Sequence, residues 1–530
     1  MSGGSDPRPP IEPTADPARE VAPQDAAAAT TGASVLGGGI WQLASRLWPQ
    51  AATLILSVAA ARFLGPDDFG RQSFIAFVSI CAITFLSGGL SVAVMRYIAE
   101  LLGRDQMAAV PGLVRWGLSI QLGAAVVGGG ALVVTGMLGA IPQLAWILAG
   151  VATAISIAQT IPNAVLIGTQ RFRQESIIGL VTDSIGLPLT IGVLAAGGGI
   201  AGIFGAQAAV AAMNLVWTSF AARSTVRERA PSDEPRPDLW RGPLTRFAIY
   251  NTLIGLLTLV VWRRSEFFFL DAYSTDAEIG LYSIAFATAA ALALVPETLA
   301  SVMAPAFATL FGAGRRDRMV SGFGRGMRIL LALSLPLTTA AVALVPTLIE
   351  VMYGSDFAAS GDVFLVMVAL FPLLPIYQVC FAVLTGMGRA AIPLILGVGA
   401  AVLNIGLDFL LIPDLEAIGA ALATTLSQIA VIVPVVVYTI HLTGRVRVDP
   451  GTLARGAIAS VAAGGAGFAS VEALGGLAGL VVGSAAWLVV FGGLAVTLGV
   501  LSRDDARWID ETAGRRARGL IGRLARALSR

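Results

Sequence analysis

Long apolar runs dominate the chain between residues 36 and 500, and short polar turns separate them. A helix rises about 1.5 Å per residue, so a run of roughly 20 residues crosses the roughly 30 Å hydrocarbon core of a bilayer. The pattern predicts an all-α integral membrane protein with about fourteen transmembrane helices, although the thirteenth run is short and glycine-rich and leaves twelve or thirteen open. The expected segments are Leu36–Phe63, Phe69–Met95, Val114–Leu138, Ala145–Ile167, Ile177–Ala196, Ile200–Phe220, Ile249–Leu270, Ile279–Leu310, Ile329–Met352, Val363–Leu384, Ile392–Ile412, Ile418–Ile440, Ala457–Ser470 and Leu477–Val500.

The amino-acid composition agrees with this pattern and limits the functions that the chain can have. Of the residues, 56% are hydrophobic and 13% charged, whereas a soluble domain carries about 25% charged residues. The net charge of +2 predicts no nucleic-acid partner. The single histidine, His441, and the two cysteines, Cys81 and Cys380, offer no converging metal ligands and no disulfide. Without a Walker loop or an HExxH motif, the chain is predicted to move a molecule rather than to make or break bonds, with no cofactor and no metal.

Arginines alternate along the chain in a way that predicts its orientation. The loops after even-numbered segments are basic, as at Arg171 and Arg173, whereas those after odd-numbered segments are short and acidic or neutral. Because positive charge stays in the cytoplasm, both termini are predicted to be cytoplasmic. Residues 1–32 are expected to form a disordered tail rather than a signal peptide. The basic, amphipathic residues 501–530 are expected to lie on anionic lipids, with a solvated tail as the alternative.

A short motif recurs at the starts of even-numbered segments. The chain reads DFGRQS from Asp68 to Ser73, EIGLYS from Glu278 to Ser283, and EAIGAA from Glu416 to Ala421. Chance similarity is the alternative, but the shared position in each half favours duplication. Two pseudo-symmetric lobes of six helices in the same orientation are therefore predicted, with a substrate site at their interface. The expected domains are lobes at 33–225 and 246–442, a cytoplasmic linker at 226–245, two extra helices at 452–500, and tails at 1–32 and 501–530.

Three ordered stretches resemble one family of membrane proteins. They are AARFLGPDDFGRQSF (Ala60–Phe74), WRRSEFFFLDAYSTDAEIGLYSIA (Trp262–Ala285) and GMGRAAIPLILGVGAAVLNIGLDFLLIPDLEAIGAALATTLS (Gly386–Ser427). They are similar to stretches of the polysaccharide transporters, the Wzx-type flippases of lipid-linked oligosaccharides. That family belongs to the multidrug/oligosaccharidyl-lipid/polysaccharide flippase superfamily, which also holds the lipid II flippases and the MATE drug exporters. The resemblance covers about residues 33–500 and implies a two-lobed fold around a central cavity, a bacterial inner membrane, a polyprenyl-pyrophosphate-linked glycan as cargo, and polysaccharide assembly proteins as candidate partners.

The seventh expected segment carries charge inside the bilayer, in the stretch LVVWRRSEFFFLD. Arg263 lies about 10 Å short of the outer end of that helix. Arg263 and Glu266 are three residues apart and can pair, whereas Arg264 points about 100° away and needs another partner. Arginine meets phosphate oxygens bidentately, so these residues are predicted to line the substrate cavity. The alternative is that both arginines snorkel to the outer interface.

Other polar residues lie at membrane depth, where charge usually faces a cavity or a partner. Asp183 is the most isolated acid, midway along the fifth segment, and Asn404 and Asp408 are four residues apart on one face of the eleventh. Glu297 follows a proline, where a broken backbone can line a cavity. An interfacial anchor is the alternative for Arg46, and helix–helix hydrogen bonding is the default for single amides. The candidates for substrate binding are Arg264, Arg263, Glu266, Arg46, Asn251 and Asn404, and those for ion coupling are Asp183, Asp408 and Glu297.

The leading hypothesis is a flippase that moves a polyprenyl-pyrophosphate-linked oligosaccharide across the bacterial inner membrane by alternating access, for surface polysaccharide biosynthesis. Without an ATPase motif, the driving force must come from ion coupling, membrane potential or product removal. The first alternative is a MATE-like exporter of small molecules, whose cavity should be acidic rather than basic. The second is a membrane enzyme such as a glycan polymerase, which usually displays a sizeable outer loop, whereas every expected outer loop here is short.

Overall fold

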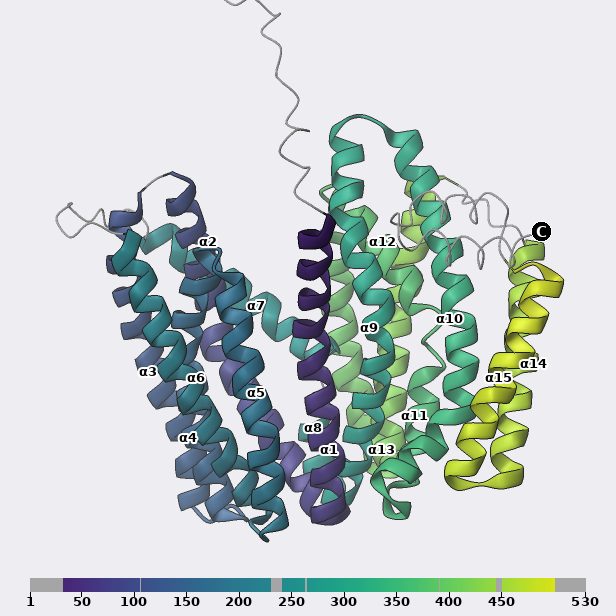
Figure 1. Cartoon of the computed structure of the whole chain (residues 1–530), viewed down its shortest axis with the longest axis horizontal. Coiled ribbons are helices and arrows are strands. Elements are labelled where there is room, and N and C mark those ends of the chain that lie inside the picture. The colour runs from purple at the N-terminus through teal and green to yellow at the C-terminus, as the bar shows by residue number, and fades with distance from the viewer. Residues whose placement is uncertain are drawn as a thin grey trace, which may run out of the picture. The chain divides into compact units, whose positions relative to one another are not determined.

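The computed structural model describes residues 32–104, 106–229, 241–262, 265–389, 391–444 and 450–500, and every regular element within these ranges is a helix (Figure 1). Residues 52–530 form one compact unit and residues 1–51 another. The tails predicted at 1–32 and 501–530 lie outside the described residues apart from Gly32, and so does the middle of the linker predicted at 226–245. The proposed lobe boundaries therefore stay predictions.

A glycine turn separates the first two expected segments. Helix α1 runs from Gly32 to Ile83 and breaks at Gly65, whose φ of 77° lies in the left-handed region that glycine adopts without strain. Pro66 follows, and proline is well suited to the first turn of a helix. A π-helical turn, Thr84–Gly88, leads into α2, Gly89–Gly103. The gap predicted between the first two segments thus falls at the observed break.

Four long helices follow in the first half of the chain. Helix α3 packs along α4, and α4 packs along α6. Glycines mark the closest approaches, since a Cβ on Gly129 would meet the backbone of Gly150. Small residues let membrane helices approach closely, and dispersion contacts between them then drive association. The bounds are α3 Val110–Met137, α4 Gln143–Gly168, α5 Phe172–Ala195 and α6 Gly199–Arg229.

The second half departs from one helix per segment in three places. The seventh segment is split into α7 and α8, the tenth is split into α11 and α12, and the eleventh and twelfth are joined in α13. Helix α13 turns at Glu416, whose φ of 51° and ψ of −127° are rare for a residue other than glycine. The bounds are α7 Arg241–Trp262, α8 Glu266–Tyr273, α9 Asp276–Gly312, α10 Arg316–Tyr353, α11 Ser360–Val368, α12 Leu374–Gly386 and α13 Ala391–Thr443.

The thirteenth segment is longer than its apolar run suggests. Helix α14 spans Pro450–Leu474, 25 residues, and α15 spans Gly476–Leu498, 23 residues. The expected range, Ala457–Ser470, was too short because the helix continues through polar and glycine positions that hydropathy leaves out. The α14–α15 hairpin packs against α10, where a Cβ on Gly464 would meet Thr339.

The lengths of these helices fit a membrane. Ten stretches are long and apolar enough to cross one by length and composition, and two of them, 48–103 and 391–443, contain 56 and 53 residues and can cross twice. Together with the split seventh and tenth segments, they account for the expected crossings. Large apolar side chains such as Val126, Phe220 and Val489 are 74%, 75% and 73% exposed, as contact with lipid requires.

Candidate functional site

A buried polar cluster surrounds Glu266, the first residue of α8. The side chain of Glu266 is 2% exposed. Its Oε1 accepts hydrogen bonds from Thr424 Oγ1 at 2.6 Å and from Asn404 Nδ2 at 3.3 Å, both on α13. Asn404 Oδ1 in turn accepts a hydrogen bond from Ser265 Oγ at 3.2 Å. The hydroxyls of Tyr282, on α9, and Thr424 lie 3.2 Å apart. Three helices therefore supply one continuous polar network.

Asp408 extends this network with a second acid. It lies one turn after Asn404 on α13, is fully buried, and is close enough to Glu266 for the two carboxyls to interact electrostatically. Among the described residues, neither oxygen of Asp408, nor Oε2 of Glu266, has a hydrogen-bond partner. Within that part of the chain, three buried carboxyl oxygens are left without a hydrogen bond.

Helix breaks bring these residues together. Helix α7 is described as far as Trp262, and α8 begins at Glu266 after Ser265, so that Glu266 stands at a helix start. The turn of α13 at Glu416 folds the chain back so that Thr424 lies near Asn404. Glu278 accepts a hydrogen bond from the backbone N–H of Ala417 at 3.2 Å and so caps the second part of α13. The repeated motif EIGLYS thus contributes Tyr282 to the cluster and, through Glu278, supports the helix that carries Thr424.

The electrostatics of the cluster call for a positive partner. The ion pairs among the described residues involve Arg71 and Arg104, and none reaches Glu266 or Asp408. Burying carboxylates without a counter-charge is costly, so burial of this pair favours protonation or a positively charged partner. The donors are carboxyl, amide and hydroxyl oxygens, which suit a hard cation rather than a thiophilic metal. The described residues also hold no group of three or more His, Cys, Asp or Glu side chains arranged for a metal.

The structure brings three predicted site residues together and leaves others apart. Glu266, Asn404 and Asp408, assigned to two different roles by sequence, form one cluster. Asn251 instead donates to the backbone carbonyl of Phe247 at 2.8 Å, a local helix contact. Asp183 lies on α5, half-buried and without a hydrogen bond or ion pair to a described residue. Arg263 and Arg264 lie outside the described residues, as do the side chains of Arg46 and Glu297.

Sequence reasoning missed three members, Ser265, Tyr282 and Thr424. Tyr282 is the fifth residue of the EIGLYS motif, whose recurrence indicated a duplication but not a binding role. Thr424 belongs to the GAALATTLS stretch but carries no charge, so it did not stand out in an apolar helix. The remaining amides behave as the default predicts, since Gln159 donates to Asn214 at 2.8 Å and Asn214 donates to Thr182 at 3.0 Å.

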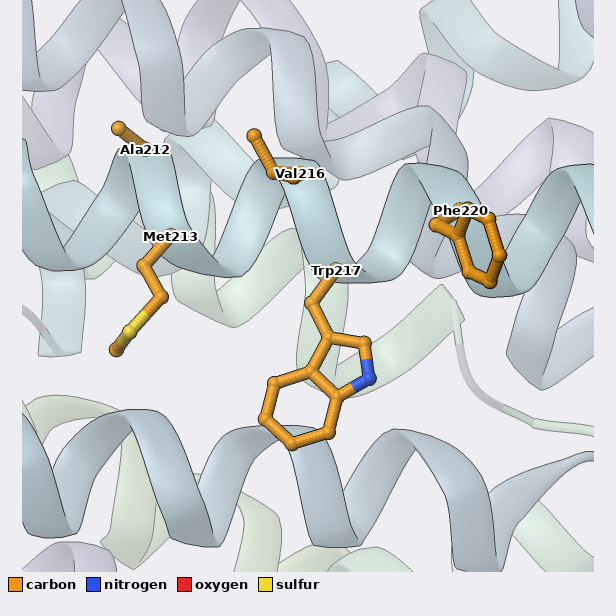
Figure 2. Close-up of a pocket in the computed structure, with 5 residues that line it drawn as sticks. All are labelled: Ala212, Met213, Val216, Trp217 and Phe220. Carbon is orange, nitrogen blue, oxygen red and sulfur yellow. The ribbon is translucent and has the colours of Figure 1, made fainter.

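Two apolar hollows contain almost no polar groups that could bind a substrate or an ion. One, of about 550 Å³, is lined by a single face of α6, and Figure 2 shows its side chains, with the indole nitrogen of Trp217 as the one side-chain polar atom among them. Another, of about 660 Å³, lies between α9, α10 and α15 and is lined mostly by Leu, Val and Ala. Neither can replace the water around a phosphate or a cation, so the cluster at Glu266 is the better candidate site.

The sequence matches a family defined across known proteins. The family model described as "Polysaccharide biosynthesis protein" matches residues 59–361, more than half of the 530 residues. The chain belongs to this family. The matched range includes Glu266 and Tyr282 of the cluster, while Asn404, Asp408 and Thr424 lie beyond it. No curated protein matches the chain by sequence.

Solved structures show what fold this family member adopts. The lipid II flippase MurJ, in an inward closed conformation, is 13% identical with a TM-score of 0.65, covering 86% of this chain and 98% of that one. An inward-facing multidrug resistance MATE family transporter of the MOP superfamily is 15% identical with a TM-score of 0.57, covering 74% and 94%. A MOP superfamily transporter from Pyrococcus furiosus is 13% identical with a TM-score of 0.54, covering 77% and 95%. The likeness establishes the fold of these multi-pass membrane transporters and confirms the predicted fold class, while the family match confirms the predicted family.

Proposed function

We propose that the protein is a flippase that moves a polyprenyl-pyrophosphate-linked oligosaccharide across the bacterial inner membrane by alternating access, for surface polysaccharide biosynthesis. One observation carries the proposal: a chain of the polysaccharide biosynthesis family has a fold similar to that of a lipid II flippase. A glycan attached to a lipid carrier is the cargo that fits both the family match and the likeness to a lipid II flippase. The solved structures similar to it are transporters, which supports transport rather than catalysis.

Orientation follows from the arginine pattern. With both termini in the cytoplasm, the turn at Gly65 and the start of α9 face the outside. The basic residues 501–530 then meet the anionic inner leaflet, and polysaccharide assembly proteins are candidate partners. Arg263 and Arg264 would precede the cluster on the seventh segment and supply the positive charge that a pyrophosphate requires.

The Glu266 cluster is the proposed ion-coupling site. It brings together two carboxyls, an amide and three hydroxyls, and among the described residues three of its carboxyl oxygens have no hydrogen-bond partner. Ionisable residues inside the membrane commonly mark ion or proton pathways. Loading by a monovalent cation such as Na⁺, or by protons, would neutralise the site and let an ion gradient drive the lipid cycle. Asp408 thus keeps its predicted role, and Glu266 and Asn404 join it.

Flipping by the purified protein tests this function. Proteoliposomes are loaded with a fluorescent lipid-linked oligosaccharide, and an external glycosidase reports how much becomes accessible. Arg264→Ala is expected to slow flipping by roughly ten-fold, because a charge-assisted bond to phosphate is lost. The matched control is Arg104→Ala, which removes an exposed arginine paired with Glu100 at 2.6 Å. Unchanged flipping in Arg264→Ala with normal folding would contradict the phosphate role, and no flipping by the wild type would contradict the function.

One observation favours a second candidate, a MATE-like exporter of small organic cations. The described polar cluster is acidic, and acids attract cationic drugs as well as coupling ions. A susceptible host expressing the protein would then show raised resistance to such drugs and active efflux of ethidium. Normal drug sensitivity together with glycan flipping would leave the flippase as the function.

A further inference from the structure

Helix α4 has two edges that differ in polarity. On one edge, Leu144 and Val151 are 58% and 41% exposed, as contact with lipid requires. On the other, Gln159 and Asn163 are four residues apart, share a face and are half-buried. Asn163 points roughly 100–120° away from the two exposed residues. Polar side chains at membrane depth usually face protein or water rather than lipid, so the amide edge of α4 is turned inward.

Helix α5 shows the same division. Val181 and Ile185 are 36% and 46% exposed. Asp183 points about 160° away from both of them and is half-buried. Its carboxylate has no hydrogen bond or ion pair with a described residue. A charge at this depth is therefore directed away from the lipid face of α5 and is left without a protein partner in the described part of the chain.

The neutral network between α4, α5 and α6 holds these two edges in place. Gln159 donates to Asn214 at 2.8 Å, and Asn214 donates to Thr182 at 3.0 Å. Asp183 follows Thr182 directly, and Asn163 lies one turn after Gln159. The side chain of Asn163, like that of Asp183, has no hydrogen bond with a described residue. The network thus fixes the helices and leaves two neighbouring polar side chains unbonded.

The charges of this region favour hydroxyl groups over ions. Residues 143–170 and 174–222 contain no arginine or lysine, so a phosphate would find no positive partner there and would be repelled by Asp183. The same ranges contain one other acid, Glu175, near the start of α5, so a hard cation would find few charged ligands. A carboxylate accepts hydrogen bonds from hydroxyls, and an amide both donates and accepts. The uncharged hydroxyls of a sugar therefore suit these edges best.

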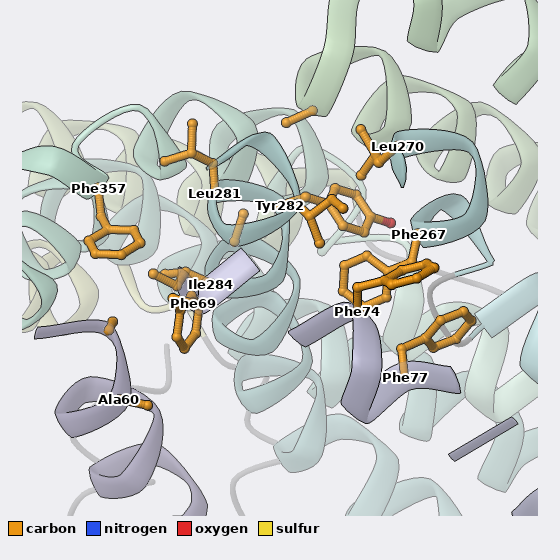
Figure 3. Close-up of a cluster of buried hydrophobic side chains, with 14 of the residues drawn as sticks. Ala60, Phe69, Phe74, Phe77, Phe267, Leu270, Leu281, Tyr282, Ile284 and Phe357 are labelled. Atoms are coloured by element: carbon orange, nitrogen blue, oxygen red, sulfur yellow. The ribbon is translucent and has the colours of Figure 1, made fainter. Parts of the chain in front are cut away.

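An aromatic core anchors the first turns of α4. Trp146 packs edge to face on Phe74 at 6.2 Å, and Phe74 is one of the rings of the hydrophobic core in Figure 3. In the orientation proposed above, this core lies at the outer end of the protein. Asn163 lies about 26 Å further along α4, on the cytoplasmic side of the core.

Two glycines of the repeated motif leave no space beside this core. A Cβ on Gly280 would stand 2.8 Å from the carbonyl oxygen of Pro66, and a Cβ on Gly70 would overlap the backbone of Asp276. The starts of DFGRQS and EIGLYS thus touch through bare backbone. A glycan has no room at this crossing, so the polar edges of α4 and α5 are the places where sugar could be bound on the cytoplasmic side of it.

We propose that Asn163 and Asp183 form a subsite for the uncharged sugar hydroxyls of the cargo. The inference rests on the proposed flippase function and assigns recognition of the glycan to the first half of the chain, while Arg263 and Arg264 hold the pyrophosphate. A site that hydrogen-bonds hydroxyls rejects a ligand that lacks them, because its own polar groups are then left unpaired. The subsite therefore selects the finished glycolipid over the bare carrier.

Two lipids with the same tail and pyrophosphate test the subsite. One is undecaprenyl pyrophosphate without sugar, and the other is the same lipid carrying the repeat-unit oligosaccharide prepared from the source cells. Their affinities for the protein in nanodiscs are measured by microscale thermophoresis at fixed pH and Na⁺ concentration. The wild type is expected to bind the glycosylated lipid at least about ten-fold more tightly than the bare one, because each hydrogen bond to a hydroxyl adds to the affinity.

Single substitutions then assign the preference to residues. Asp183→Ala is expected to weaken binding of the glycosylated lipid about ten-fold, because bonds to a charged acceptor are lost, and Asn163→Ala about five-fold. Affinity for the bare lipid should not change in either variant, which also reports that each one is folded. The matched control is Ser184→Ala, next to Asp183 on the exposed side of α5, and it should leave both affinities unchanged.

The remaining outcomes separate the subsite from the proposed function. Equal losses for both lipids in Asp183→Ala, or a wild type without preference for the glycosylated lipid, would overturn the subsite and leave transport of the carrier lipid standing. Binding of neither lipid by the wild type would overturn the flippase function and the subsite with it. If Asp183→Ala keeps the preference but its flipping no longer depends on pH, Asp183 carries protons instead and the subsite is rejected.

Discussion

Two polar networks within the described part of the chain, one partly buried and one buried, differ in charge. In the first half, Gln159, Asn214 and Thr182 join α4, α6 and α5 through bonds of 2.8 and 3.0 Å, and all three side chains are neutral. In the second half, Glu266, Asn404 and Thr424 join α8 and α13 in a similar way. Here a second acid, Asp408, is present, and three oxygens of the two acids have no hydrogen-bond partner among the described residues. A satisfied neutral network serves helix packing, whereas an unsatisfied acidic one needs a ligand.

The strongest test of this difference between the two networks is to remove one charge from the acidic one. Asp408→Asn keeps the shape of the side chain and is expected to weaken Na⁺ binding, measured by ²²Na⁺ scintillation proximity, by at least about 100-fold, because a binding oxygen loses its charge. In cation-free medium the variant should unfold at a higher temperature than the wild type, because one uncompensated buried charge is gone. A lower melting temperature in that medium, with Na⁺ affinity preserved, would make Asp408 a packing residue.

A milder change removes a neutral donor from the acidic network. Thr424→Val preserves the branched shape but deletes the hydroxyl that donates to Glu266 at 2.6 Å. Removal of such a supporting bond is expected to weaken Na⁺ binding about ten-fold, measured in the same assay. Thr425→Val, at the neighbouring buried position, is the matched control and should leave the affinity unchanged. Equal effects of the two substitutions would argue against a specific role for Thr424.

The smallest expected effect on function comes from the neutral network. Asn214→Leu removes the bonds to both Gln159 and Thr182 and is expected to lower the free energy of unfolding by about 1 kcal/mol, since such bonds average about 0.6 kcal/mol in membranes. Na⁺ affinity should not change. Steric-trap unfolding in bicelles measures the first quantity and ²²Na⁺ binding the second. A loss of Na⁺ affinity in this variant would mean that the two networks are not independent.

The sequence predicts the membrane segments well because crossing a bilayer imposes one length and one polarity on every helix. It also places Asn404 and Asp408 on one face, since four residues make about one turn. It could not predict where a helix breaks inside an apolar run. The segment from Ile249 to Leu270 was expected to be one helix, yet a new helix, α8, begins at Glu266 after Ser265.

Which residues meet in the cluster could not be predicted from the sequence either. Glu266 and Asn404 are separated by 138 residues, and the contact between them depends on the packing of α8 against α13 rather than on any local spacing. A local partner, Arg263, was the natural expectation for Glu266 and lies outside the described residues, whereas nothing in the sequence pointed to the bonds of Oε1 with Thr424 and Asn404. Threonine and tyrosine in apolar helices give no signal of their own, because both are common as packing residues there.

The contact between Gly70 and Gly280 also constrains the history of the chain. If the two halves descend from one duplicated segment, this is a point where the copies still press on each other, with no room for a Cβ on either side. Elsewhere each copy was free to drift. Because the two backbones touch at this crossing, a larger side chain in either copy would displace the other. Both positions must therefore retain glycine while the rest of the protein diverges.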